Sequence, residues 1–92
     1  MVFFAVDRSF MHLGRDQVVL VGRVRGGLVE PGDLLDVPGL GEVEIASVES
    51  VAFADGRQVP CVCFAATAME SSPEFEPASL DGTELQVVPQ WS

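Results

Sequence analysis

The chain has 92 residues, of which 14 are acidic and five are basic, and its formal net charge is −9 at pH 7. This length supports one domain with a single core, and an apolar content of 48% excludes a disordered chain. The charge disfavours nucleic acid and anionic membranes as partners, because both are polyanions that clustered Lys and Arg would have to neutralise.

The N-terminal segment and the cysteines indicate the compartment. The apolar run 2–6 ends at Asp7 and has no basic residue before it, so it lacks the pattern of a signal peptide. No apolar run approaches the ~20 residues that a membrane helix requires. Two cysteines, Cys61 and Cys63, are fewer than a disulfide scaffold uses. We therefore expect a free-standing, cytoplasmic protein that does not associate with a membrane.

Val-rich segments dominate the first third of the chain, and β-branched side chains favour strands. We predict strands at 2–6 and 9–13, and a longer strand at 17–25. The 17–25 segment is apolar on both faces, which is typical of a central strand or of a closed barrel. Gly22 interrupts this strand and predicts a bulge or a sharp bend there.

The segment 30–33 has the composition of a tight turn. Pro31 fixes φ, Gly32 accepts a positive φ, and the Asp33 side chain can cap the turn. We predict that Gly27 also takes a turn conformation.

Further strands are predicted at 34–37, 42–53, 59–66 and 84–88. The 42–53 segment begins as a half-buried strand, and its alternation changes phase after Ala46, which predicts a bulge or bend. The Asp-Gly pair at 55–56 is a hairpin signal.

The segment 67–79 has no clear period and contains Pro, Ser and Glu, so it is predicted to be a long acidic surface loop. Six or seven short strands with Gly and Pro turns between them indicate an all-β sandwich or barrel. A barrel has the advantage of removing open strand edges. We expect one domain over residues 1–92.

The segment 22–35 fits the pattern G-R-V-x-x-G-x-V-x-x-G-D-x-L without a gap. This pattern closely resembles the second domain of elongation factor Tu and related translation GTPases. The resemblance implies a small, closed, six-stranded Greek-key β-barrel of the translation-factor domain 2 type. In that family the domain helps to hold the aminoacyl end of tRNA or touches ribosomal RNA. The chain has no Lys, so it cannot contain the phosphate-binding loop of the GTPase domain itself.

The residues that carry this resemblance are interpreted as a structural turn signature and not as a functional site, because function resides in sites and not in folds. They are Gly22, Gly27, Pro31, Gly32 and Asp33.

No catalytic or metal-binding constellation is visible in the sequence. Cys61 and Cys63 are two residues apart on a predicted strand, so they share one face. A Cys-x-Cys pair with His12 as the only His does not have the spacing of a zinc site, and buried apolar thiols are the favoured interpretation. We predict that the protein is not an enzyme and has no metal or cofactor.

The 67–79 loop is the strongest candidate for an interaction site. It combines the apolar Met69 and Phe75 with acidic residues such as Glu70 and Glu76, which would form apolar anchors with a charged rim. Loops of this length are often functional.

Arg23 and Arg25 share one strand face and form either a small basic patch or ion pairs with the many acidic side chains. The favoured function is a non-catalytic module that binds another protein. The alternatives are an RNA- or tRNA-binding, translation-associated accessory domain, and a barrel that binds a small ligand.

Overall fold

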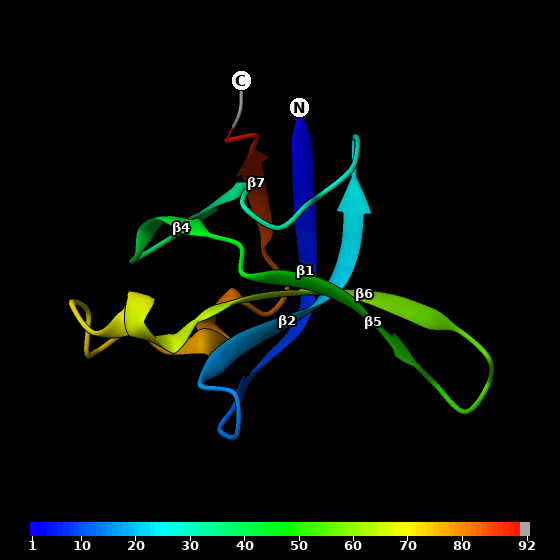
Figure 1. Cartoon of the computed structure of the whole chain (residues 1–92), viewed down its shortest axis with the longest axis horizontal. Coiled ribbons are helices and arrows are strands. Elements are labelled where there is room, and N and C mark those ends of the chain that lie inside the picture. The colour runs from blue at the N-terminus through cyan, green and yellow to red at the C-terminus, as the bar shows by residue number, and fades with distance from the viewer. Residues whose placement is uncertain (91–92) are drawn as a thin grey trace.

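The computed structural model describes residues 1–90 and has an all-β fold with 52% strand (Figure 1). The strands are β1 (Val2–His12), β2 (Gln17–Arg25), β3 (Leu34–Val37), β4 (Gly41–Glu44), β5 (Ser47–Ala52), β6 (Gln58–Ala65) and β7 (Glu84–Val88). Two 3-10 helices, η1 (Ala66–Met69) and η2 (Pro77–Leu80), lie in the segment that connects β6 to β7. The strands predicted at 17–25, 34–37 and 84–88 are confirmed as β2, β3 and β7.

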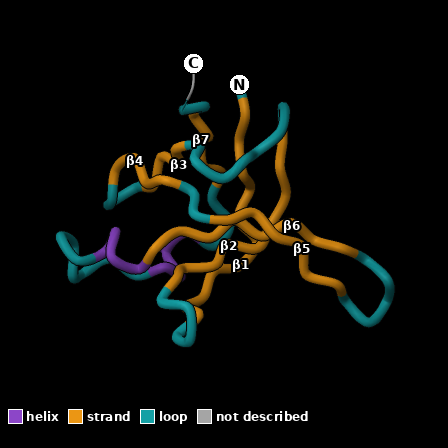
Figure 2. The backbone as a smooth tube through the Cα atoms, in the orientation of Figure 1, coloured by secondary structure: helices purple, strands orange, loops and turns teal. Residues whose placement is uncertain are grey.

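The strands form one curled antiparallel sheet in the order β4-β3-β7-β1-β2-β6-β5. This sheet is a half-barrel, so the expectation of a closed six-stranded barrel is wrong in strand number and in closure. The reason lies in the 41–52 segment, where β4 and β5 follow each other along one path instead of pairing side by side (Figure 2).

Ile45 and Ala46 connect these two edge strands and bend the chain between them. The Ile45 amide donates to the carbonyl of Asp33 beside β3, whereas the Ala46 amide donates to the carbonyl of Cys63 in β6, both at 2.8 Å. The chain thus leaves one edge of the sheet and joins the other within two residues. The change of phase predicted after Ala46 is this break.

The expected strands 2–6 and 9–13 are one strand, β1, with a bulge. The register against β2 shifts between Val6 and Arg8, so Asp7 is the extra residue. Gly22 lies opposite Val6, and a Cβ added there would sit 1.8 Å from the carbonyl oxygen of Ala5. The bend predicted at Gly22 therefore occurs in the β1–β2 pair, with the extra residue on β1.

The turn before β3 uses Gly32 and Asp33 as the sequence predicts. Gly32 has a φ of 95°, and the buried Asp33 carboxylate accepts a hydrogen bond from the Glu30 amide at 3.0 Å. At the preceding corner the positive φ of 86° belongs to Gly26 and not to Gly27. Gly27 is constrained by packing and not by its backbone conformation, because a Cβ added there would lie 2.7 Å from Val2 Cγ2.

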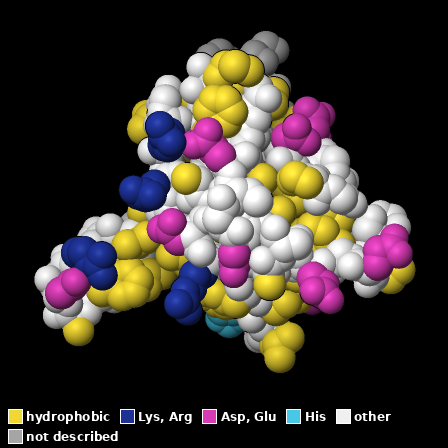
Figure 3. Space-filling model, turned by 180° about the vertical axis from the view of Figure 1, so that it is seen from behind, with side chains coloured by type: hydrophobic (Ala, Val, Ile, Leu, Met, Phe, Trp, Pro, Cys, Tyr) yellow, Lys and Arg dark blue, Asp and Glu magenta, His cyan; other side chains and the backbone are white. Residues whose placement is uncertain are grey.

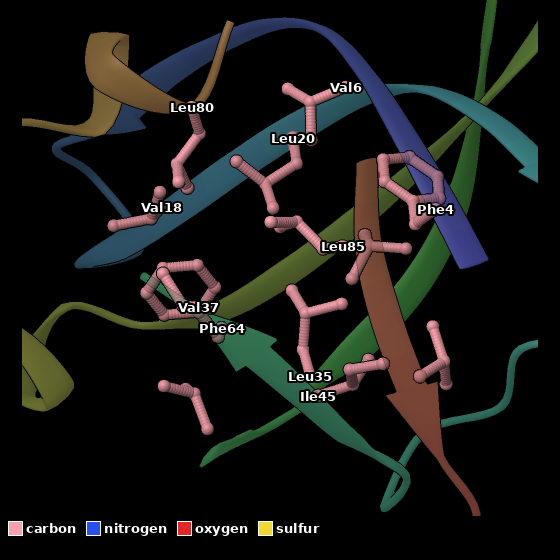
Figure 4. Close-up of a cluster of buried hydrophobic side chains, with 13 residues drawn as sticks. Phe4, Val6, Val18, Leu20, Leu35, Val37, Ile45, Phe64, Leu80 and Leu85 are labelled. Atoms are coloured by element: carbon pink, nitrogen blue, oxygen red, sulfur yellow. The ribbon is translucent and has the colours of Figure 1, made fainter. Parts of the chain in front are cut away.

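The main core fills the concave side of the sheet (Figure 4). It contains the buried side chains Phe4, Val6, Val18, Leu20, Leu35, Val37, Val43, Ile45, Val62, Phe64, Leu80, Leu85 and Val87. Leu80 enters from η2 and points toward Val18 and Leu20, so the segment between β6 and β7 closes one end of the core (Figure 4).

Candidate functional site

The 67–79 segment leaves its two predicted apolar anchors, Met69 and Phe75, only partly exposed. Met69 and Phe75 are partly buried and pack against the main core. The side chains that remain exposed in this segment include Glu70 and Glu76. In the predicted arrangement of apolar anchors with a charged rim, the anchors are therefore partly buried and the acidic rim is exposed.

Hydrogen bonds hold this segment against the sheet. The Ser72 hydroxyl donates to the carbonyl of Gly39 at 3.2 Å. On the other side, the Ser9 hydroxyl lies 2.5 Å from the carbonyl oxygen of Pro77 and 2.7 Å from Asp81 Oδ1. These contacts make the segment a cover for the core.

A hollow of about 380 Å³ lies between this segment and the turn after β3. It is lined by Pro38, Gly39, Ser72, Glu74, Phe75, Glu76 and Ser79. The charged lining groups are two carboxylates with no basic side chain beside them, so the hollow would repel anionic ligands.

The second predicted site residues, Arg23 and Arg25, lie in β2 and are exposed. Arg25 forms an ion pair with Glu84 at 3.0 Å, with 69% and 42% of the two side chains exposed. Such an exposed pair contributes at most about 1 kcal/mol. Among the described residues, Arg23 has no ion-pair partner.

A different surface resembles a binding site more closely than the 67–79 segment or the Arg23–Arg25 region does. It lies on the outer, convex side of β1, β2, β6 and β5, opposite the main core. Val19 and Val21 of β2 pair with Cys63 and Cys61 of β6. Val19 and the two thiols are buried together in a second apolar cluster, and Val21 packs against it.

Two adjoining hollows lie over this cluster. The smaller, of about 140 Å³, is lined by Phe10, His12, Arg15, Val19, Glu49, Ser50, Val51, Cys61 and Cys63. The larger, of about 330 Å³, is lined by Arg8, Phe10, Val21, Val51 and Phe53. Because Phe10 and Val51 belong to both hollows, we treat the two as one feature, the outer groove.

The outer groove brings three exposed large apolar side chains together. Phe10 is 48% exposed, Val51 is 40% exposed and Phe53 is 42% exposed. Figure 3 shows apolar side chains gathered at the base of the projecting β5–β6 hairpin, with basic side chains beside them. Contiguous apolar patches of this kind mark binding surfaces more often than isolated exposed residues do.

Arginines stand at both ends of the outer groove. At one end, Arg15 forms an ion pair with Glu49 at 3.0 Å. At the other end, the Arg57 guanidinium lies 5.3 Å from the centre of the Phe53 ring and pairs with Asp55. Arg8 lines the larger hollow and has no ion-pair partner among the described residues.

The Cys61 thiol in the floor of the groove is a poor nucleophile. Both cysteines are free and buried. Burial raises the pKa of the Cys61 thiol above its ordinary value, and the nearby Cys63 and Glu49 raise this pKa further. The reactive thiolate is therefore disfavoured, and the same-face placement predicted for the pair serves packing.

This protonation state has a measurable consequence. In a Cys63→Ser variant at pH 8, we expect Cys61 to be alkylated by iodoacetamide at least about tenfold more slowly in the folded chain than in urea. Mass spectrometry of the labelled peptide gives both rates. Because the folded-state pKa is the raised one, the neutral thiol stabilises the fold below the ordinary thiol pKa, and this contribution is lost as the pH rises through the raised value. Equal alkylation rates in the two states would contradict the assignment.

Among residues 1–90, no group of three or more His, Cys, Asp or Glu side chains is placed to hold a metal ion. None of the helices in this part of the chain has the length and hydropathy needed to cross a bilayer.

The fold and this surface define an all-β half-barrel with an apolar groove on its outer face. The chain matches no known family, no curated protein and no solved structure.

Sequence reasoning missed the groove although its signals were present. The 17–25 segment is apolar on both faces, which we interpreted as typical of a central strand or of a closed barrel, and β2 does lie inside the sheet between β1 and β6. Only one of these faces meets the main core, and the other meets the groove. Phe10 is about 40 residues from Val51 and Phe53 in the sequence, and only the register of β1, β2, β6 and β5 brings it near them.

Proposed function

We propose that this protein is a non-catalytic module that binds another protein through the outer groove. The observation that carries the proposal is the partial exposure of Phe10, Val51 and Phe53 around an apolar floor. Leaving such side chains in water forgoes about 25 cal/mol for each Å² of apolar surface that a partner would bury. Aromatic side chains at the centre of a contact surface supply much of the affinity of protein complexes.

The resemblance to translation-factor domain 2 supports a second proposal, that this chain is related to that domain. It also supports RNA binding as the alternative function. The motif 22–35 spans the end of β2, the Gly32–Asp33 turn and the start of β3, which are adjacent parts of one structural unit. Arg23 and Arg8, both without ion-pair partners among the described residues, favour the RNA alternative. The net charge of −9 favours a protein partner.

A small-ligand function is the third candidate, and the two hollows of about 140 and 330 Å³ support it. Both hollows lie on a convex sheet face with exposed walls, whereas typical ligand sites bury most of the ligand surface. This geometry fits side chains of a partner better than a free metabolite.

Site-specific photo-crosslinking in cells tests the proposal. A photoreactive residue in place of Val51 is expected to capture a protein, whereas the same residue in place of the exposed Glu42 on β4 is the matched control and is expected to capture none. Capture at Val51 should disappear in a chain that also carries Phe10→Ser and Phe53→Ser, with circular dichroism showing that the fold remains. Adducts with RNA alone, no adduct at Val51, or adducts that ignore the two Ser substitutions would overturn the proposal.

A further inference from the structure

We infer that the outer groove accepts a short, extended, acidic segment of its partner, with two apolar side chains two residues apart. This inference rests on the function proposed above and specifies the chemistry of the partner. Three observations support this inference. They are the spacing of the two hollows, the distribution of charge over the molecule, and the packing of the chain's own acidic segment.

The spacing of the two hollows fits an extended chain. The smaller hollow is lined by Val19 of β2 and by Cys61 and Cys63 of β6, and the larger hollow is lined by Val21, which lies two residues further along β2 and pairs with Cys61. Two residues of a strand span about 6.6 Å, which is also the distance between side chains on one face of an extended ligand. Two apolar side chains at positions i and i+2 of a bound segment therefore match the two hollows.

The distribution of charge along the chain bears on the charge of the partner. Nine of the 14 acidic residues lie in the segments 30–44 and 70–81, which contain no Arg or Lys. The other five acidic residues and all five arginines balance each other, so the net charge of −9 resides in those two segments. The groove thus belongs to the neutral part of a strongly acidic molecule.

Within the groove the acidic side chains are already engaged. Glu49 pairs with Arg15, and Asp55 pairs with Arg57. Arg8 has no such partner among the described residues, and the adjacent Asp7 at the bulge is exposed and does not pair with it. A carboxylate of a bound segment next to the larger hollow would therefore find an uncompensated guanidinium, which favours acidic partners and speeds their association.

A second copy of this chain does not supply such a segment. The 69–76 segment has the required composition, with Met69 and Phe75 among glutamates. These two side chains are partly buried against their own core, however, so a second copy could insert them into the groove only by giving up that packing. We therefore assign the groove to a different protein and not to self-association.

Binding of two labelled peptides to the full chain tests the inference by fluorescence anisotropy. The acidic peptide is acetyl-Asp-Leu-Ser-Phe-Asp with a C-terminal dye, and its counterpart carries Lys in place of both Asp residues. At low salt we expect the Lys peptide to bind at least about tenfold more weakly, equivalent to ~1.4 kcal/mol. The preference should decrease as salt is added, because exposed charges are screened.

Two variants with the same change in net charge separate local from global electrostatics. Arg8→Glu lies in the groove and should reverse the preference between the peptides, whereas Arg25→Glu lies outside the groove and should leave it in place. Equal binding of both peptides, tighter binding of the Lys peptide, or equal effects of the two variants would overturn the inference. So would concentration-dependent dimers that disappear on Phe53→Ser.

The outcomes also separate this inference from the proposed function. If Val51 captures a protein in a groove-dependent way but neither peptide binds, the chemistry assigned to the partner is wrong and the binding module remains. If Val51 captures no protein, the proposed function itself is wrong, whatever the peptides do.

Discussion

A Gly22→Ala variant is expected to lose most of its stability, by more than about 3 kcal/mol, which is a large share of the ~5–14 kcal/mol typical for a chain of this length. The added Cβ would sit 1.8 Å from the carbonyl oxygen and 2.9 Å from the carbonyl carbon of Ala5. Both are backbone atoms of the paired strand β1, so no side chain can rotate away to make room. Relief requires β1 and β2 to separate at the bulge.

The consequence extends beyond one contact because β1 and β2 are the central strands of the sheet. Separation at Gly22 disturbs the pairing of Val6, whose side chain is buried in the main core. It also disturbs Arg8 and Phe10, which line the outer groove. Stability and binding should therefore fall together in this variant.

Urea unfolding followed by circular dichroism measures the effect. Gly14→Ala is the matched control, because its added Cβ would meet only the His12 ring at an ordinary distance of 3.5 Å, and we expect it to change stability by less than about 0.5 kcal/mol. A Gly22→Ala chain that unfolds at the same urea concentration as Gly14→Ala would show that the β1–β2 pair is looser than described.

The contrast between these glycines explains how far the sequence alone leads. Composition and turn chemistry are local, so they predicted strands at 17–25, 34–37 and 84–88 and the bend after Ala46. A strand interrupted by Gly22 predicted a bulge or bend. The atom that excludes a side chain there belongs to Ala5, and that identity depends on register.

Whether the sheet closes into a barrel, and which side chains face the core, depend on strand register even more strongly. The closed barrel was expected from the resemblance, and nothing in the 42–53 segment states that one half pairs with β3 and the other half with β6. The same limit applies to the groove, because alternation shows that Cys61 and Cys63 share a face but not which face meets the core. The sequence also could not show that Met69 and Phe75, predicted as apolar anchors of an acidic surface loop, pack partly against the main core.

The second large effect is expected on the other side of β6. Phe64 is fully buried in the main core, and its replacement by Ala should destabilise the chain by about 3–5 kcal/mol, through lost burial and the cavity that remains. Urea unfolding gives this value directly. Phe53→Ala is the matched control, since Phe53 is 42% exposed and packs only along the outer groove, and its cost should stay below about 1 kcal/mol.

The comparison distinguishes the roles of the two apolar faces. If the concave face holds the fold together and the outer face serves binding, Phe64→Ala lowers stability while Phe53→Ala lowers affinity for the acidic peptide and leaves the urea midpoint nearly unchanged. A Phe53→Ala chain that loses as much stability as Phe64→Ala would place the outer face within the folding core. The exposed aromatic side chains of the outer face would then no longer be evidence for a docking surface.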